Sequence, residues 1–153
     1  MATQQSVQSE QKVTKKPEPI KQYILQGDST TEPNESFRTR MAVVGYRNYN
    51  DYDHIKRELD FFNSKRKIDL IVSGGCTGVD TLAERWADEN NVPKKILLPI
   101  KALGKRSYAL RDHGIVDHST HMIAFPSDQG RGTQITIEMA KKKNIKLRVV
   151  NIN

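Results

Sequence analysis

Short apolar runs alternate with amphipathic segments from residue 39 onward. Apolar residues recur at helical spacing after Asp51 or Asp53, and again over 81–91 and 134–144. Residues 101–114 are polar, which predicts a connecting stretch. Five runs of aliphatic residues predict buried strands at 41–45, 68–75, 94–99, 121–126 and 146–152. This alternation is typical of a doubly wound α/β fold, so we predict a mainly parallel five-stranded sheet with helices on both faces.

The first 38 residues lack this pattern. They are rich in Gln, Ser, Thr, Lys, Glu and Pro, with few aliphatic residues. Such a segment cannot bury enough apolar surface to offset the entropy lost on ordering. We therefore expect a mostly disordered polar tail over 1–38 and one domain over 39–153. Tyr23, Ile24 and Leu25 form a small apolar cluster in the tail that could dock on the domain or on a partner.

The predicted carboxyl ends of the strands carry the residues best suited to a ligand. In open parallel sheets, ligands bind outside those ends, where the strand order reverses. The polar stretch adds Lys105, Arg106 and Arg111, which either line this crevice or solvate a loop. The loops after the first, second and fourth predicted strands supply the other candidate ligand-binding residues: Gly45, Tyr46, Arg47, Ser73, Gly74, Gly75, Thr77, Gly78, Asp80, Gly130, Gly132 and Thr133.

The segment 71–80, IVSGGCTGVD, holds three of the nine glycines. A glycine turn that enters a helix presents free backbone N–H groups, which bind phosphate or carboxylate. The alternative is a tight turn with close packing, and the two are compatible. Gly78 is followed by Val79 and Asp80 rather than by Lys and Ser or Thr, and G-x-G-x-x-G is absent. The sequence thus argues against a P-loop ATPase and a nicotinamide dehydrogenase.

Two side chains in this segment have alternative roles. Thr77 and Asp80 have the spacing of a capping box, so Asp80 either holds the helix start or accepts hydrogen bonds from a ribose or an amine. Cys76 precedes the helix, where the dipole is expected to lower the pKa of a thiol. No histidine lies near it in the sequence, which favours a small residue filling the turn over a nucleophile.

Charge and composition narrow the class of partner. The net charge of +7 and the pI near 9.5 favour anionic partners such as nucleotides or nucleic acid. The single cysteine excludes an intramolecular disulfide and indicates a reducing, cytoplasmic compartment. No apolar run is long enough to cross a membrane. The four histidines complete no metal signature, so we expect no metal and no cofactor beyond a nucleotide-type ligand.

These motifs together resemble a known family. The chain has Gly-x-Arg after the first strand, Ser-Gly-Gly-x-x-Gly-x-Asp after the second, and Gly-Arg-Gly-Thr before the last helix. Over about residues 40–150 this resembles the YspA/YpsA-related branch of the SLOG superfamily, which also contains DprA/Smf and the LOG enzymes. The resemblance implies a Rossmann-like domain that binds nucleotides or derivatives such as ADP-ribose, homo-oligomerisation, and an association with phages or mobile elements.

The chain departs from the LOG pattern at its candidate base. LOG enzymes carry P-G-G-x-G-T-x-x-E, and here the glutamate position holds Thr136. Glu138 lies two residues later, which turns it by about 200° around a helix. The YspA/YpsA-related branch often has asparagine where this chain has Asp112, and a small residue where it has Tyr46, whose ring could stack on a base.

Three functions stay open from the sequence. The first is a nucleotide-binding or sensing module. The second is a hydrolase of nucleotide N-glycosidic bonds, with Asp80, Asp112 or Glu138 as the catalytic base. The third is a DprA-like accessory protein that binds single-stranded DNA.

Overall fold

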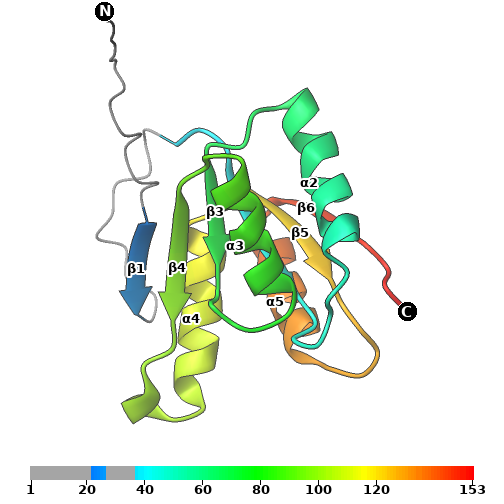
Figure 1. Ribbon diagram of the computed structural model, residues 1–153. Helices are drawn as coiled ribbons and strands as arrows, with labels where there is room; N and C mark the ends of the chain where they lie inside the picture. Colours follow the sequence, from blue (N-terminus) through cyan, green and yellow to red (C-terminus); the bar gives the residue numbers. More distant parts are fainter. Residues whose placement is uncertain (1–21, 27–36) are drawn as a thin grey trace, which may run out of the picture.

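One parallel sheet organises the protein. The computed structural model describes residues 22–26 and 37–153, and these form six strands in the order β1-β4-β3-β2-β5-β6, with every neighbouring pair parallel. The strand arrows in Figure 1 therefore point toward the same edge of the sheet. The predicted parallel α/β fold is confirmed, and its five predicted strands are β2 to β6. The strands are β1 (Gln22–Gln26), β2 (Arg40–Gly45), β3 (Leu70–Ser73), β4 (Lys94–Leu98), β5 (His121–Phe125) and β6 (Lys146–Val149).

Strand β1 raises the number of strands from the predicted five to six. It contains Tyr23, Ile24 and Leu25, the apolar cluster of the mostly disordered predicted tail for which the sequence left docking on the domain or on a partner open. Gln22 pairs with Lys94 and Gln26 with Leu98, so β1 extends the sheet beyond β4. Without it, β4 would present unpaired N–H and C=O groups at the sheet edge, and a short added strand satisfies them. The rest of the predicted tail before Phe37 lies outside the described residues.

Helices cover both faces of the sheet, as predicted. Helices α2 and α3 pack on one face, where Ile55 and Trp86 meet Val43. Helices α4 and α5 pack on the other, where Ile115 and Ile137 join a second apolar cluster. Figure 1 shows α2 and α3 in front of the sheet and α4 and α5 behind it. The helices are α2 (Tyr52–Lys65), α3 (Val79–Glu89), α4 (Arg106–Asp117) and α5 (Gly132–Lys142), with a 3-10 turn η2 (Lys101–Leu103) before α4.

The prediction of a connecting stretch over 101–114 is wrong in part, because helix α4 begins at Arg106. Its buried residues include Ser107, Arg111 and Gly114 besides Ile115 and Val116. The inward side of the helix is therefore not an apolar stripe, and hydrophobic periodicity does not reveal it. By contrast, α2 begins as predicted, because the carboxylate of Asp51 accepts a hydrogen bond from the backbone N–H of His54 at 3.1 Å.

The strand order reverses between β2 and β5. The chain runs from β2 to β3 and β4 on one side of the sheet, then returns to place β5 and β6 on the other side of β2. At such a switch point the two connecting loops leave in opposite directions, which opens a crevice beyond the carboxyl ends of the strands.

Candidate functional site

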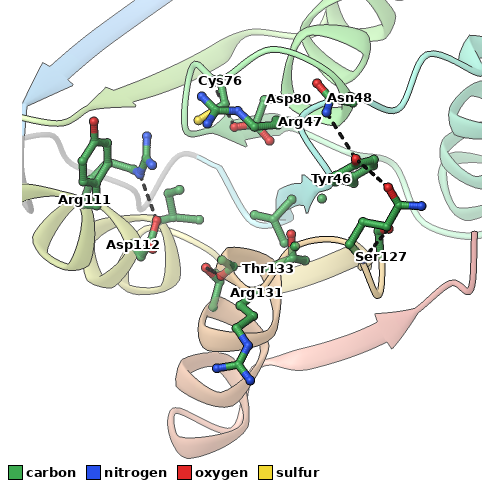
Figure 2. Close-up of a pocket in the computed structure, with 18 residues that line it drawn as sticks. Tyr46, Arg47, Asn48, Cys76, Asp80, Arg111, Asp112, Ser127, Arg131 and Thr133 are labelled. Carbon is green, nitrogen blue, oxygen red and sulfur yellow. Dashed lines mark hydrogen bonds and ion pairs between the residues drawn. The ribbon is translucent and has the colours of Figure 1, made fainter. Parts of the chain in front are cut away.

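A cleft of about 460 Å³ lies at this switch point. Its walls come from the loop after β2, the entry to α3, the cleft-facing side of α4, and the loop that leads into α5 (Figure 2). The crevice expected from the sheet topology is therefore present. It brings together nine of the residues singled out in the sequence: Gly45, Tyr46, Arg47, Asp80, Arg111, Asp112, Gly130, Gly132 and Thr133.

Backbone conformation and close packing both require glycine at positions 75 and 78 of the β3–α3 loop. Gly75 and Gly78 have φ angles of 72° and 75°, which side chains rarely adopt. A Cβ on Gly75 would lie 2.6 Å from Cδ2 of Leu98, and one on Gly78 would lie 2.4 Å from the carbonyl of Arg47. Neither glycine is among the residues that line the cleft, and neither is Gly74. The tight, closely packed turn thus accounts for Gly75 and Gly78 without a ligand.

The glycines of the β5–α5 loop have no such structural reason. Gly130 and Gly132 both line the cleft, and neither has a positive φ. A Cβ on Gly132 would meet no atom within 4 Å, and one on Gly130 would touch only the ring of Tyr46 at 3.6 Å. No side chain caps the first turn of α5. The N–H groups of a helix start are therefore presented beside the cleft, where they can bind an anion.

Asp80 lies buried in the cleft wall, with 6% of its surface exposed. Its Oδ2 accepts a hydrogen bond from the backbone N–H of Cys76 at 3.2 Å. Burial raises the pKa of Asp80 to about 7, against the opposing effects of the Cys76 N–H and Arg111. A carboxyl with this pKa can hold or release a proton near neutral pH.

The predicted capping box does not form. The hydroxyl of Thr77 donates to the carbonyl of Arg47 at 3.0 Å, and Gly78 occupies the N-cap position without a side-chain bond. Because Thr77 is turned toward the β2–α2 loop, it cannot cap α3. Asp80 instead fixes the loop before the helix through Cys76.

Arg111 connects two walls of the cleft from its buried position on α4, where it is 7% exposed. Its Nη1 donates to the carbonyl of Gly74 at 2.5 Å, and its Nε donates to Oδ1 of Asp112 at 2.9 Å. Figure 2 shows the Arg111–Asp112 pair facing the cleft from α4. Burial raises the pKa of Asp112, although Arg111 opposes the shift. The buried carboxyl of Asp80, the partly buried carboxyl of Asp112 and the guanidinium of Arg111 therefore lie in this part of the cleft.

The pKa of Cys76 is shifted in the direction opposite to the one that the sequence predicted. The helix start was expected to lower the pKa of its thiol, but burial raises that pKa, and the neighbouring carboxyl of Asp80 raises it further. Arg111 and Arg47 act in the opposite direction and do not reverse the shift. A protonated thiol is a poor nucleophile, so this environment does not activate Cys76.

Several candidates from the sequence lie outside the cleft wall. Ser73 is fully buried, and its hydroxyl donates to Oε2 of Glu84 at 2.6 Å. Lys105 and Arg106 are exposed around the start of α4. Glu138 is exposed on α5 and pairs with Lys141 at 3.4 Å. Of the three proposed catalytic carboxylates, the fold thus places Asp80 and Asp112 in the cleft and Glu138 away from it.

Sequence reasoning missed part of the cleft wall. On α4, Tyr108, Arg111 and Ile115 recur at helical spacing, a signal that becomes visible only once α4 is recognised. Asn48 lies in a loop, where no periodicity marks it. The lining residues that were not singled out as site residues are Val44, Asn48, Cys76, Tyr108, Ile115, Ser127, Gln129, Arg131 and Thr136.

Two further classes of feature are not found in the part of the chain that the structure describes. No group of three His, Cys, Asp or Glu side chains there converges as a metal site would. No helix within 37–153 combines the length and apolar character needed to cross a bilayer.

Comparisons with known proteins agree with this fold. DNA processing protein A of Streptococcus pneumoniae superposes with a TM-score of 0.65 at 18% identity, over 78% of this chain and 52% of that protein. DNA processing protein A of Helicobacter pylori superposes with a TM-score of 0.60 at 20% identity, over 83% of this chain and 71% of that protein. This chain thus spans about half the length of the S. pneumoniae protein.

A family match covers the first half of the domain. No curated protein gives a significant match to the sequence. Residues 39–99, from the start of the domain to the end of β4, match the YspA, cpYpsA-related SLOG family. This segment contains two of the motifs that carry the resemblance, Gly-x-Arg after β2 and Ser-Gly-Gly-x-x-Gly-x-Asp after β3, whereas Gly-Arg-Gly-Thr lies beyond it. The resemblance to the YspA, cpYpsA-related SLOG family is therefore confirmed over residues 39–99.

Proposed function

We propose that the cleft binds a nucleotide-derived ligand whose phosphate sits at the first turn of α5. The observation that carries this proposal is the open glycine pair, Gly130 and Gly132. Both line the cleft although neither packing nor backbone conformation requires glycine there. A ligand that must approach the backbone closely explains their lack of side chains.

The neighbouring side chains fit the rest of such a ligand. Arg47 lines the cleft and is exposed, so its guanidinium can neutralise a phosphate. The buried carboxyl of Asp80 can hydrogen-bond the hydroxyl groups of a ribose. The cleft volume of about 460 Å³ lies within the range of small-molecule sites.

Binding without turnover is the form of this proposal that we favour. Thr136 lines the cleft at the position where the LOG pattern has its glutamate, whereas Glu138 is exposed and paired with Lys141. The N-glycosidic hydrolase would have to use Asp80 or Asp112 instead. Chromatography of each nucleotide after incubation with the protein tests this alternative, because a hydrolase releases free base.

The test of the proposed function is calorimetric titration of the full chain with ADP-ribose, AMP and ribose 5-phosphate. In Gly132→Asp, an aspartate suits the first helical turn but repels a phosphate, so affinity should fall by about tenfold or more. The matched control is Gln134→Asp, which adds the same charge to the same turn at a residue outside this cleft. The proposal fails if none of the three compounds binds, or if both variants bind as tightly as the unaltered chain.

A second candidate function is the binding of single-stranded DNA. The H. pylori relative is described as having a distinctive single-stranded DNA binding mode. In this chain Tyr108 lines the cleft with 54% of its surface exposed, two residues from Arg106 and three from Lys105. An exposed ring beside basic residues is the arrangement on which unpaired bases stack.

Fluorescence anisotropy with a labelled thymidine oligonucleotide tests this second function. Binding to DNA should weaken steeply as salt is raised, and Tyr108→Ala should weaken it further. Absence of binding at low salt would exclude it. Homo-oligomerisation, implied by the family resemblance, stays a prediction for light scattering to test.

A further inference from the structure

Three side chains form a hydrogen-bonded chain across the mouth of the cleft. Tyr46 and Asn48 belong to the loop after β2, and Gln129 belongs to the loop after β5. The Nδ2 of Asn48 donates to the Tyr46 hydroxyl at 3.2 Å, and this hydroxyl donates to Oε1 of Gln129 at 3.5 Å. Figure 2 shows the two bonds meeting at the tyrosine hydroxyl. All three residues line the cleft.

This chain of bonds couples the orientations of the two amides. In the structure the hydroxyl accepts an N–H from Asn48 and gives its single proton to Gln129. The remaining atoms are Oδ1 of Asn48, an acceptor, and Nε2 of Gln129, a donor. Neither atom makes another hydrogen bond among the described residues. In this orientation the cleft mouth offers one acceptor, from Asn48, and one donor, from Gln129.

The ring of Tyr46 supplies a flat surface beside these two groups. A Cβ on Gly130 would lie 3.6 Å from Cδ1 and 3.7 Å from Cε1 of the ring, so the ring packs over this glycine. The glycine and the hydrogen bonds together hold the tyrosine between the two loops. An aromatic ring held in this way can stack on a nucleobase.

We propose that Tyr46, Asn48 and Gln129 read the base of the nucleotide ligand and select adenine. The inference rests on the proposed function, since it requires a nucleotide in the cleft. Adenine presents an amino group as donor next to a ring nitrogen as acceptor, which suits Oδ1 of Asn48 and Nε2 of Gln129. Hypoxanthine has the same shape but reverses this polarity on its Watson–Crick edge, where a carbonyl adjoins a ring N–H.

The experiment compares the dissociation constants of AMP and IMP, which share the sugar and the phosphate. The unaltered full chain should bind AMP about tenfold more tightly than IMP, the discrimination expected of a good pair of base contacts. In Tyr46→Phe the ring remains but the hydroxyl is lost, so both amides can turn. The AMP-to-IMP ratio should then approach one, with AMP affinity reduced by less than about threefold.

The control is Tyr52→Phe, which removes a hydroxyl bonded to Glu89 from a tyrosine that does not line the cleft. It should keep the full preference for AMP. Urea unfolding of both variants verifies that each is folded at the temperature of the titrations.

The outcomes separate the two proposals. If ribose 5-phosphate, AMP and IMP all fail to bind, the proposed function itself is lost. If AMP and IMP bind equally to the unaltered chain, a nucleotide site exists but the base reading is overturned. A preference for AMP that persists in Tyr46→Phe would also overturn it, because the hydroxyl would then not set the polarity.

Discussion

The backbone of Arg47 packs directly against Gly78: a Cβ built on Gly78 would lie 2.4 Å from the carbonyl carbon and the carbonyl oxygen of Arg47. The loop after β2 therefore rests on the entry to α3. The hydroxyl of Thr77 strengthens the same contact by donating to that carbonyl. These two contacts hold the backbone of Arg47 in position beside the cleft.

We predict that alanine substitutions of glycine will destabilise the protein in the order Gly78, Gly104, Gly132. Gly78 combines a positive φ with a backbone clash, Gly104 has a φ of 65° and open space, and Gly132 has neither constraint. Gly78→Ala should lower the free energy of unfolding by about 3 kcal/mol, Gly104→Ala by about 1 kcal/mol, and Gly132→Ala by less than about 0.5 kcal/mol. Urea unfolding measures all three, and a reversed order would contradict this account of the loops.

Asp80 should make stability depend on pH in a defined direction. Its pKa rises from an ordinary value of 3.8 to about 7 on folding, so the folded chain holds this proton more tightly than the unfolded chain. The stability that the protonated carboxyl contributes is therefore complete below its ordinary pKa, and is lost as the pH rises through the folded pKa.

Asp80→Asn isolates this effect because asparagine does not titrate. The difference in unfolding free energy, variant minus unaltered chain, should grow with pH between 3.8 and about 7 and then level off. Its slope should be at most about 1.4 kcal/mol per pH unit. Parallel stability curves for the two proteins would show that Asp80 is not buried as described.

Cys76 should react slowly with iodoacetamide at neutral pH. It is the single cysteine of the chain, so mass spectrometry reports its alkylation directly. Burial and Asp80 raise the pKa of the thiol, so the midpoint of the rate against pH should lie above that of the same chain unfolded in urea. Asp80→Asn should move the midpoint downward. An equal midpoint in the folded and unfolded protein would contradict the prediction.

Arg111→Lys should destabilise the protein although it keeps the positive charge. A lysine cannot reproduce the planar pair of bonds from Arg111 to Gly74 and Asp112, and it would leave buried groups without their partner. We expect a loss of about 2 to 4 kcal/mol in urea unfolding. Arg106→Lys, at an exposed position on the same helix, should change stability by less than about 0.5 kcal/mol.

The sequence predicted the sheet because strands β2, β3 and β5 are buried along nearly their whole length. Such runs stay apolar without alternation, and the glycines and prolines after them mark their ends. Helix α4 escaped prediction because it buries Ser107 and Arg111 on its inward side. Strand β1 was anticipated only as the apolar cluster Tyr23, Ile24 and Leu25, because a pattern of five residues does not show that the segment pairs along the open edge of β4.

The sequence indicated where the candidate site lies, but not which glycines are required for packing and which are open to the cleft. A parallel sheet brings the carboxyl ends of its strands to one edge, so Gly45, Asp80 and Gly132 were expected near one another. The reason for each glycine depends on what its missing side chain would touch. Leu98, which excludes a side chain at Gly75, lies 23 positions further along the chain.

The two glycine loops give the cleft one wall that resists mutation and one that can vary. Substitutions at Gly75 or Gly78 damage the packing of the domain, so this wall would stay unchanged among descendants of the protein. Side chains can be added at Gly132 at little structural cost, and that residue lines the cleft. New ligand preferences could therefore evolve through the segment from Ser127 to Thr133, while the rest of the scaffold is inherited intact.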